Sequence, residues 1–285
     1  MSEGRGKKNL KYTIGHFASI LGLTTDTIRL YEKHDIVCPQ KNDHNHYRYF
    51  NDLDARNLLM SRWFRSAEIP LQETAALVNE SSSACILHSF EESRRNIQLE
   101  IDHKQRLLNR ITEIMNQISE AEHTLYQCKI KEQRGFYRIK QTNKNELLPP
   151  DGLQEIVSQW MDCLPFLFYS FRIENAQALL EEGHLFEYNW GISLPENEVK
   201  FIQEEWRTLI EYIPPAICLS SYINLNQDDD IAPQHLKHMA DQLLQEGHTT
   251  VKDIVGKIIF VEKTNQQSKT FMEVNIPISE IEVFS

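Results

Sequence analysis

Small polar, basic and aromatic residues gather in one stretch near the start of the chain, TTDTIRLYEKHDIVCPQKNDHNHYRYF, residues 24–50. Thr24 is a residue type that caps helices, and the spacing of Ile28 and Tyr31 predicts a short helix that turns these two side chains inward. Short polar side chains and an arginine at a helix N-terminus suit entry into a DNA major groove, and the outward residues here are Thr25, Asp26 and Arg29.

The end of this stretch is suited to contacts with phosphate groups. Pro39 stops the preceding element, and QKNDHNH predicts a loop tip between two short extended pieces, which is a wing. We expect Tyr47 and Arg48 to face outward and to place a phenol and a positive charge on phosphates, while Tyr49 and Phe50 are candidates for packing. The alternative interpretation is a solvated helix face and loop. The candidate DNA-contacting residues are Thr25, Arg29, Lys41, His46, Tyr47 and Arg48.

Several short helices must position these residues. An apolar stripe after Thr13 predicts a first helix, Gly22 ends it, and the helix that begins at Thr24 follows directly, so the pair predicts a helix-turn-helix. Asn51 and Pro70 are suited to begin two further helices. We therefore expect a winged helix-turn-helix DNA-binding domain over residues 10–80.

The charge distribution separates this part from the remainder. The chain of 285 residues has 30 Lys+Arg and 41 Asp+Glu, a formal net charge of -11. Residues 1–80 contain 11 of the basic and 10 of the acidic residues, so the acidic excess lies in the other 205. Only the first part could approach a polyanion without a large repulsive field, and its basic cluster is interpreted as a local phosphate footprint.

A long heptad pattern follows the predicted DNA-binding domain. No proline or glycine interrupts residues 84–134, and apolar positions recur at alternating spacings of three and four. This pattern is typical of a coiled coil, and we predict a dimerisation helix over 84–134, with one helix of a monomeric bundle as the alternative. The seam positions are Ile97, Ile101, Lys104, Leu108, Ile111, Met115, Ile118, Glu122 and Leu125.

Two charged seam positions predict the orientation of the dimer. In a parallel dimer Lys104 would face its own copy, and so would Glu122, and both contacts are repulsive. One antiparallel register sets Lys104 against Glu122 of the second copy and also aligns the apolar pairs Leu108–Ile118 and Ile111–Met115. The alternative is that both charged side chains reach solvent and a neighbouring register forms.

The third part, residues 135–285, alternates strand-like and helix-like segments. YRIKQ, LQEIVSQWM, PFLFYSFRI and LFEYNWGISL are followed by IPPAICLSSYI, QHLKHMADQLLQ, GKIIFVEK and FMEVNIPI. This order predicts two βαββ-like units that share one sheet. The predicted fold class for the whole chain is α+β, with a winged helix-turn-helix, a long coiled-coil helix and a C-terminal α+β ligand-binding domain.

Aromatic residues of this third part could form a cage for a small molecule. A pocket for a cationic aromatic compound needs a few aromatic side chains and a carboxylate, although most of the aromatic residues must belong to the core. Glu187, Glu262 and Glu273 are the acids considered, with exposed surface carboxylates as the alternative. The candidate ligand-binding residues are Tyr169, Tyr188, Trp190, Tyr222, Glu187 and Glu262.

The segment YTIGHFASILGLTTDTIRLYEKHDIVCPQ, followed by HYRYFNDLDARNLL, resembles the winged helix-turn-helix of the MerR family of bacterial transcription regulators. FEYNWGISLP and IPPAICLSSYI are similar, more weakly, to the GyrI-like effector-binding domain. The resemblance implies an antiparallel homodimer that binds double-stranded promoter DNA, acts together with RNA polymerase and responds to a small-molecule effector. The sequence departs from the family pattern at two positions. His46 stands where the family usually has a glycine before YRY, and Phe260 stands where many relatives carry an acidic residue.

Other functions find less support. The sequence lacks G-x-S-x-G, P-loop, G-x-G-x-x-G and H-E-x-x-H motifs, so we do not expect an enzyme or a cofactor. No apolar run reaches membrane-spanning length, and a cytoplasmic location is the expectation. His44 and His46 form only a weak metal signal, and no metal site is predicted. Two alternatives stay open: a metal- or redox-sensing regulator that uses Cys85 and Cys128, and an acidic coiled-coil scaffold protein.

Overall fold

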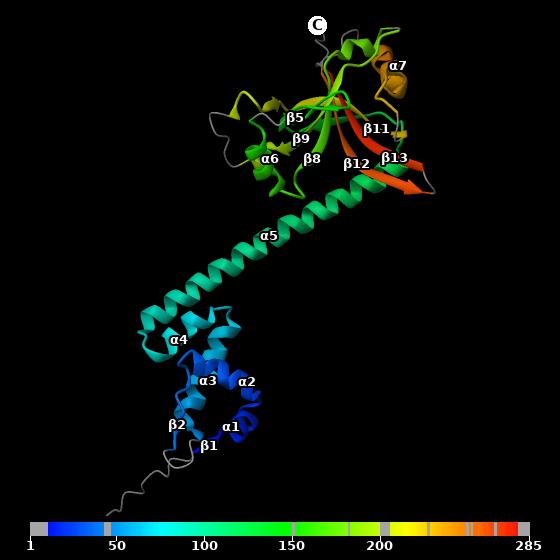
Figure 1. Cartoon of the computed structure of the whole chain (residues 1–285). Helices are drawn as coiled ribbons and strands as arrows, with labels where there is room; N and C mark the ends of the chain where they lie inside the picture. The colour runs from blue at the N-terminus through cyan, green and yellow to red at the C-terminus, as the bar shows by residue number, and fades with distance from the viewer. Residues whose placement is uncertain are drawn as a thin grey trace, which may run out of the picture. The chain divides into compact units, whose positions relative to one another are not determined.

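A computed structural model describes residues 11–42, 47–149, 152–181, 183–199, 206–226, 229–248, 251, 253–264 and 267–278. The chain divides into two compact units, residues 1–105 and 106–285, each described here by itself. Figure 1 labels the elements of both units. The predicted wing residue His46 lies outside the described residues.

The first unit begins with two short helices and a small sheet. The helices are α1 (Ile14–Leu21) and α2 (Thr25–Lys33), and Gly22 ends α1 in the left-handed conformation with φ of 65°. The sheet has the order β1-β3-β2, with β1 (Tyr12–Thr13), β2 (Gln40–Lys41) and β3 (Arg48–Phe50). Phe50 of β3 stacks on Phe17 of α1 at 4.7 Å between ring centroids, so the sheet is held against the helices by a shared core.

Two further helices complete the first unit. In α3 (Asp52–Ser66), the Asn51 side chain accepts hydrogen bonds at the N-terminus and the Asp54 carboxylate accepts one from the backbone N–H of Asn51, a reciprocal cap. Asp54 also accepts a bond from the Cys38 N–H at 2.9 Å, which ties the start of α3 to the segment that precedes the wing. Pro70 precedes α4 (Leu71–Asn79). The sequence therefore placed the starts of both helices correctly.

The long helix α5 runs from Ser83 to His123. Its first part belongs to the first unit, where Phe90 packs on Phe64, and its part from Arg106 onward belongs to the second. None of the helices in the described ranges is long and apolar enough to cross a membrane.

The predicted helix boundary at residue 134 is wrong. The chain leaves the helix after His123, takes a positive φ of 59° at Tyr126, and enters β4 (Lys129–Gln133). The physical cause is the open edge of a sheet. The Tyr126 N–H donates to the Tyr222 carbonyl at 2.8 Å, and β4 then pairs with the strand that contains Tyr222. The predicted seam residue Leu125 consequently lies beyond the helix, where it bridges to Tyr222.

The second unit is built on an antiparallel sheet of eight strands in the order β10-β5-β9-β8-β12-β13-β11-β4. Strand β5, helix α6 and strands β8 and β9 form one strand–helix–strand–strand unit, and β11, α7, β12 and β13 form a second. Strands β8 and β12 pair with each other and join the two units. The bounds are β5 (Phe136–Lys140), α6 (Gln154–Met161), β8 (Phe168–Ile173), β9 (Tyr188–Pro195), β10 (Glu211–Ile213), β11 (Ala216–Asn226), α7 (Lys237–Gln245), β12 (Ile254–Thr264) and β13 (Gln267–Pro277). A two-stranded ribbon, β6 (Thr142–Asn143) with β7 (Glu146–Leu147), and short 3-10 turns complete the unit.

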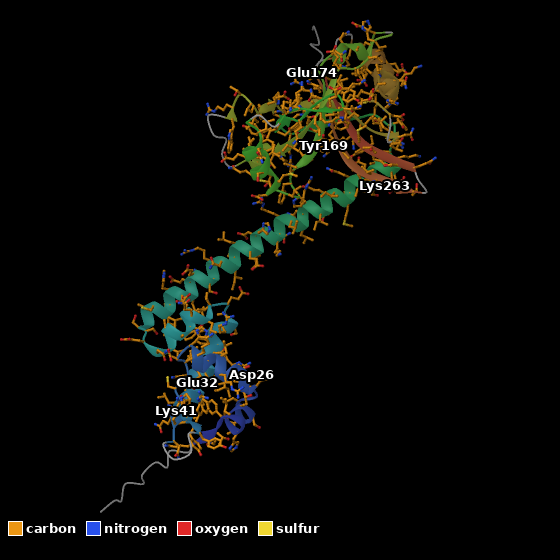
Figure 2. All side chains as sticks on the ribbon, viewed as in Figure 1. Asp26, Glu32, Lys41, Tyr169, Glu174 and Lys263 are labelled. Carbon is orange, nitrogen blue, oxygen red and sulfur yellow. The ribbon has the colours of Figure 1, made fainter. Side chains whose placement is uncertain are left out.

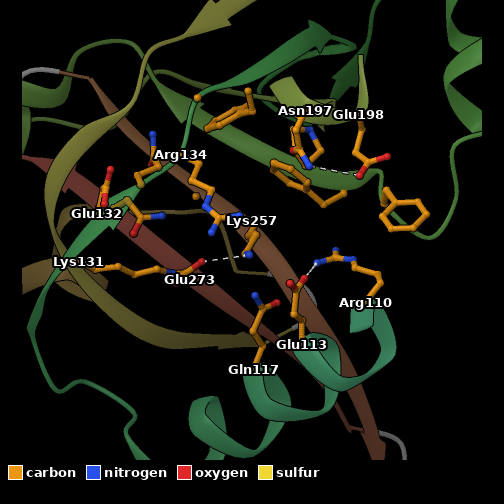
Figure 3. Close-up of a pocket in the computed structure, with 18 of the residues that line it drawn as sticks. Arg110, Glu113, Gln117, Lys131, Glu132, Arg134, Asn197, Glu198, Lys257 and Glu273 are labelled. Carbon is orange, nitrogen blue, oxygen red and sulfur yellow. Dashed lines mark hydrogen bonds and ion pairs between the residues drawn. The ribbon is translucent and has the colours of Figure 1, made fainter. Parts of the chain in front are cut away.

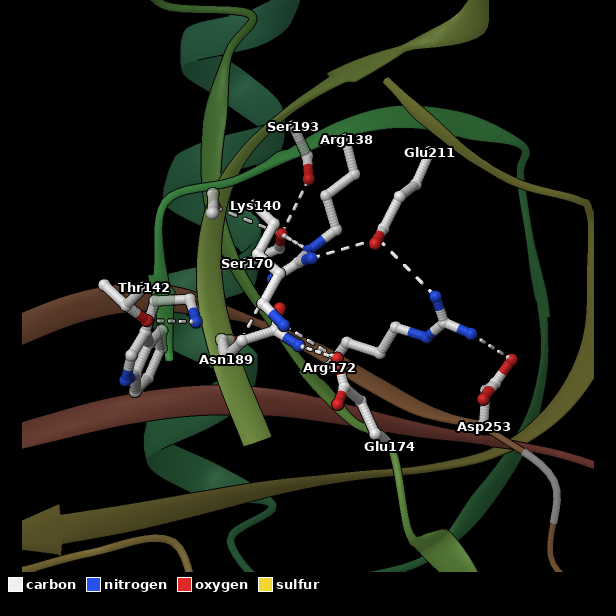
Figure 4. A network of polar contacts seen from close by, with 12 residues as sticks. Arg138, Lys140, Thr142, Ser170, Arg172, Glu174, Asn189, Ser193, Glu211 and Asp253 are labelled. Carbon is white, nitrogen blue, oxygen red and sulfur yellow. Dashed lines mark hydrogen bonds and ion pairs between the residues drawn. The ribbon is translucent and has the colours of Figure 1, made fainter. Parts of the chain in front are cut away.

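The two faces of this sheet differ in chemistry. One face is apolar and is covered by α6 and α7, with Phe171, Ile192 and Met272 among its buried residues. The other face, which we call the polar face, carries the alternate residues of the same strands. Arg138 of β5 is fully buried there and donates hydrogen bonds to Ser170 at 3.0 Å, the Asn189 carbonyl at 2.9 Å and Glu211 at 3.1 Å (Figure 4).

A glycine makes room for this arginine. A Cβ on Gly191 would lie 2.2 Å from the backbone oxygen of Ile139 and 3.2 Å from the Arg138 Cζ atom, so a larger residue there would displace the paired strand and crowd the guanidinium. Arg172 extends the network, with Glu211 at 3.5 Å and Asp253 at 2.9 Å (Figure 4). The network therefore rests on a close approach that only glycine permits.

We expect Arg138→Met to lower the free energy of unfolding by about 3 kcal/mol, because it removes the hydrogen bonds of a fully buried guanidinium and leaves Ser170 and the Asn189 carbonyl without this donor. Urea unfolding followed by circular dichroism measures the change. Arg56→Ala is the matched control, since Arg56 pairs with Asp52 at 3.0 Å in solvent and such pairs contribute about 1 kcal/mol or less. Equal effects of the two substitutions would contradict the structural role given to Arg138.

Candidate functional site

The predicted recognition helix is α2, and its two faces are as expected from the sequence. Ile28 and Tyr31 are buried, and the Thr24 side chain accepts a hydrogen bond from the Thr27 N–H at 3.1 Å. Arg29 is exposed and pairs with Asp26 at 3.0 Å, one turn away on the same surface. Thr25 is half-buried at the helix start. The exposed residues of α2 are Asp26, Arg29, Leu30 and Lys33, so the helix offers two cations, one carboxylate and one apolar side chain to solvent.

The wing brings further basic side chains beside this helix. Lys41 of β2 lies directly across from Arg48 of β3 in the small sheet. Arg48 forms an ion pair of 2.8 Å with Glu32 near the end of α2, so its guanidinium is oriented by this helix. Figure 2 labels Glu32 and Lys41 in this unit. Tyr47 is 64% exposed. The contact to Glu32 was not expected from the sequence, because the two residues are joined only by the fold.

A cavity of about 480 Å³ lies within the second unit, between the polar face of the sheet and the C-terminal part of α5. Its floor is an ion cluster. The carboxylate of Glu273, 2% exposed, binds Lys131 through one oxygen and Lys257 at 3.3 Å through the other (Figure 3). Asn275 lies two residues along the same strand and accepts a hydrogen bond from Ser220 at 2.6 Å.

Burial and charge oppose each other in this cluster. Burial alone would raise the pKa of Glu273, but Lys257 and Lys131 outweigh it and hold that pKa below its usual value, so the carboxylate stays ionised. Burial lowers the pKa of the Lys257 ammonium, and Glu273 opposes that shift. The cluster therefore places one ionised carboxylate between two lysine side chains.

The rim and walls of the cavity come from α5 and from strand ends. Arg106 and Arg110 of α5 pair with Glu198 at 2.6 Å and Glu113 at 3.3 Å. Gln133 of β4 is nine-tenths buried at the wall, and within the described chain neither atom of its side-chain amide has a hydrogen-bond partner. Figure 3 shows Glu113 and Gln117 on the helix turned toward the strands. The apolar wall residues are Phe136, Phe166 and Phe168.

The structure brings together three of the predicted aromatic ligand residues on the opposite, helix-covered face. Tyr169 stacks on Trp190 at 5.5 Å, and Tyr188 lies 6.3 Å from Trp190 between ring centroids. Tyr188 and Trp190 line a second cavity of about 380 Å³, together with Asp229. The pKa of Tyr188 is raised to about 12, mainly by burial and secondly by its hydrogen bond to Asp230.

The other predicted ligand residues lie elsewhere. Tyr222 is 2% exposed on the polar face, where it pairs with Glu273 across the strands and donates to Glu120 of α5 at 3.1 Å. It therefore cannot join a cage with Trp190, because paired residues share a face and Trp190 belongs to the other. Glu187 and Glu262 are exposed and line neither cavity.

Sequence reasoning missed most of the cavity floor. Glu273 was one of the acids considered, but the two lysines, Gln133 and the α5 residues were not singled out. A signal existed in FMEVNIPI, where Glu273 and Asn275 alternate with the apolar residues Met272, Val274 and Ile276, which predicts a strand with one polar face. Phe260 stacks on Phe271 at 4.3 Å.

The cysteines of the alternative sensor hypothesis have different environments. Cys85 is exposed, and hydrogen bonds from Ser82 lower its pKa, whereas burial raises the pKa of Cys128. Among the described residues no group of three or more His, Cys, Asp or Glu side chains could hold a metal ion. Neither cysteine therefore has the set of neighbouring ligands that a metal site requires.

Residues 12–81, which contain the helix-turn-helix and the wing, match the family of MerR HTH family regulatory proteins. The HTH-type transcriptional regulator CueR of Escherichia coli O6:H1 is 30% identical over 109 residues, which cover 38% of this chain and 72% of CueR. The chain belongs to the MerR family. Its matched relatives in this family are transcription regulators.

Other similarities to MerR-type proteins are shorter or more distant. The HTH-type transcriptional activator TipA of Streptomyces coelicolor is 27% identical over 74 residues, 26% of this chain, and the chain spans only 29% of TipA. The EcmrR–DNA complex, solved by cryo-EM, aligns with 95% of this chain and 100% of that chain at 17% identity, with a TM-score of 0.37.

The cysteine environments predict an order of alkylation at pH 7.5. Cys85 should react with iodoacetamide first, because the thiolate is the reactive form and its pKa is lowered. Cys218 is fully buried, and burial raises its pKa to about 11, so it should react only after unfolding. Peptide mass spectrometry over time measures both. Equal native-state rates for the two would show that these environments are wrong.

Proposed function

We propose that this MerR-family protein is a ligand-responsive transcription regulator that binds promoter DNA through α2 and the wing. The observation that carries the proposal is the surface formed by Arg29, Tyr47, Arg48 and Lys41, which gathers three cations and a phenol on the exposed side of α2 and of the strands that follow it. His46 is a further proposed contact. Arg29 is assigned to base edges, and Arg48 and Lys41 to phosphates.

Two substitutions distinguish these roles. Arg48→Ala should weaken binding to a selected duplex and to an unrelated duplex equally, and should reduce the salt slope by about one, because a phosphate contact carries no sequence information. Arg29→Ala should weaken binding to the selected duplex by about 1–3 kcal/mol and affect the unrelated duplex less. Fluorescence anisotropy with a duplex selected from a random-sequence pool measures both.

Charge-matched variants complete this experiment. Lys263→Ala removes a cation from the second unit and should leave binding unchanged. Glu32→Gln removes the carboxylate that pairs with Arg48 and should tighten binding to both duplexes. If Arg48→Ala leaves both the affinity and the salt slope unchanged, the wing does not contact DNA. An acidic scaffold protein, the alternative from another class, would show no salt-dependent binding to any duplex.

We further propose that α5 forms an antiparallel homodimer through its exposed apolar stripe. Leu108, Ile111 and Met115 are 57%, 45% and 64% exposed in the single chain, and Lys104 and Glu122 are exposed on the same face. The residues that line the cavity occupy the opposite face of α5, because positions 106, 110, 113 and 117 lie about half a turn from 104, 108, 111 and 115. A second copy could therefore cover the stripe without entering the cavity.

Charge reversal tests the orientation of this dimer. Lys104→Glu should raise the dimer dissociation constant by about tenfold or more, because it faces Glu122 of the second copy, and Lys104→Glu with Glu122→Lys should restore it. Sedimentation equilibrium on the full chain measures the constant. Lys263→Glu is the control for charge alone. A double variant that dimerises no better than the single variant would exclude the proposed pairing.

The second unit is proposed to bind the effector in the cavity on its polar face. Support comes from its volume, its convergent polar groups and its α5 wall, whose other face carries the proposed dimer stripe. The resemblance to GyrI-like domains agrees with this role. In this proposal, effector binding changes how the dimer presents promoter DNA to RNA polymerase. A metal- or redox-sensing regulator remains the rival, favoured only by the lowered pKa of Cys85.

A further inference from the structure

We propose that the cavity on the polar face selects an organic anion, a carboxylate, sulfonate or phosphate ester attached to an apolar body. This inference rests on the proposed effector function of the second unit. It assigns the ligand a negative charge, whereas the aromatic cage expected from the sequence would bind a cation.

The first argument is the charge of the floor. Glu273 is the only buried acid of the floor among the described residues, and each of its two oxygens already binds a lysine. Each ammonium group has three N–H donors, so Lys131 and Lys257 retain donors after bonding Glu273. Two cations against one anion leave a net charge of +1 at the closed end of the cavity.

The rim does not reverse this charge. Arg106 and Arg110 are matched by Glu198 and Glu113, and the exposed residues Glu132 of β4 and Arg134, just after β4, contribute one charge of each sign. The excess positive charge therefore lies where solvent screens it least, which is the position that acts most strongly on a bound ligand.

A cation would meet a worse environment. Near Glu273 it would lie beside the two lysine side chains that already bind both carboxylate oxygens, and their positive charges would repel it. An anion instead meets unused N–H donors. The side-chain amide of Gln133, nine-tenths buried and without a hydrogen-bond partner in the described chain, can add a further N–H donor.

The walls define the rest of the ligand. Phe136, Phe166 and Phe168 line the cavity, and Arg106 lies over the Phe166 ring at 5.1 Å from its centroid. A cavity of about 480 Å³ falls within the usual range of about 300–1,000 Å³ for small-molecule sites. An aromatic or short aliphatic body would occupy the phenylalanine wall while the anionic group reaches the lysines.

Two probes of equal size and opposite charge test the proposal. The probes are 2-naphthoate and 2-naphthyltrimethylammonium, titrated calorimetrically into the full-length protein. We expect the wild type to bind 2-naphthoate at least about tenfold more tightly than the cation. Lys131→Gln should weaken the binding of 2-naphthoate. Lys131→Gln together with Lys257→Gln should make the protein prefer the cation, since the floor then carries a net charge of -1.

Further variants keep the test interpretable. Glu273→Gln should strengthen the binding of 2-naphthoate. Lys263→Gln removes the charge of an exposed lysine outside the cavity and should leave the affinity for both probes unchanged. Circular dichroism melting identifies any variant that fails to fold, and Lys131→Gln leaves Glu273 paired with Lys257, so it tests the charge rule with the least disturbance. Trp190→Ala reports on any cation that binds in the second cavity instead.

The outcomes separate the two levels of the proposal. If the wild type prefers the cation and Glu273→Gln abolishes its binding, the anion inference is wrong and the cavity remains the effector site. If neither probe responds to any substitution in the floor, the cavity is not the effector site, and both the inference and the proposed role of the polar face fail.

Discussion

The pairing of β4 with the edge of β11 is the constraint on which the second unit depends. It begins at the Tyr126 N–H and continues through five residue pairs from Lys129 to Gln133. Backbone hydrogen bonds of this kind leave little freedom in register, so they hold the end of α5 against the sheet. Glu120 of α5 adds bonds to Lys129 and Tyr222, which lower the pKa of its carboxyl group. Without this anchor the polar face would have no second wall.

The anchoring gives α5 two different faces. One carries Arg106, Arg110 and Gln117 and closes the cavity, and the other carries the apolar stripe that the single chain leaves exposed. An exposed stripe of this length on a soluble helix is unfavourable unless a partner covers it. Because both faces belong to one helix, a ligand that shifts the first face would also shift the second, which would couple the proposed effector site to the proposed dimer.

Positive charge is local in this acidic protein. On the wing, Lys41 and Arg48 are adjacent and solvent-exposed, which suits a polyanion that is itself highly hydrated. In the cavity, Lys131 and Lys257 are held against a buried carboxylate, which suits a small anion that exchanges water for fixed donors. The acidic remainder keeps non-specific polyanions away from the second unit, so each cluster can serve a different ligand.

The sequence by itself determined the elements whose cause is local. Caps at Thr24 and Asn51, the breaker Gly22 and the periodicity of Ile28 and Tyr31 depend on neighbours within a few residues, so the helix-turn-helix and its wing strands could be located. Only the tertiary structure decided where α5 ends, because a sheet edge formed by residues about a hundred positions away captured the chain.

The candidate effector site, like the end of α5, was decided only by the tertiary structure. Composition drew attention to aromatic residues, but strand alternation places Trp190 and Tyr222 on opposite faces of the sheet. Lys257 and Glu273 face each other on the consecutive strands β12 and β13, but Lys131 of β4 lies 142 positions before Glu273, and no local pattern reveals that two lysines share one carboxylate. The charge of a buried site depends on which side chains the fold brings together, and that information is present only in three dimensions.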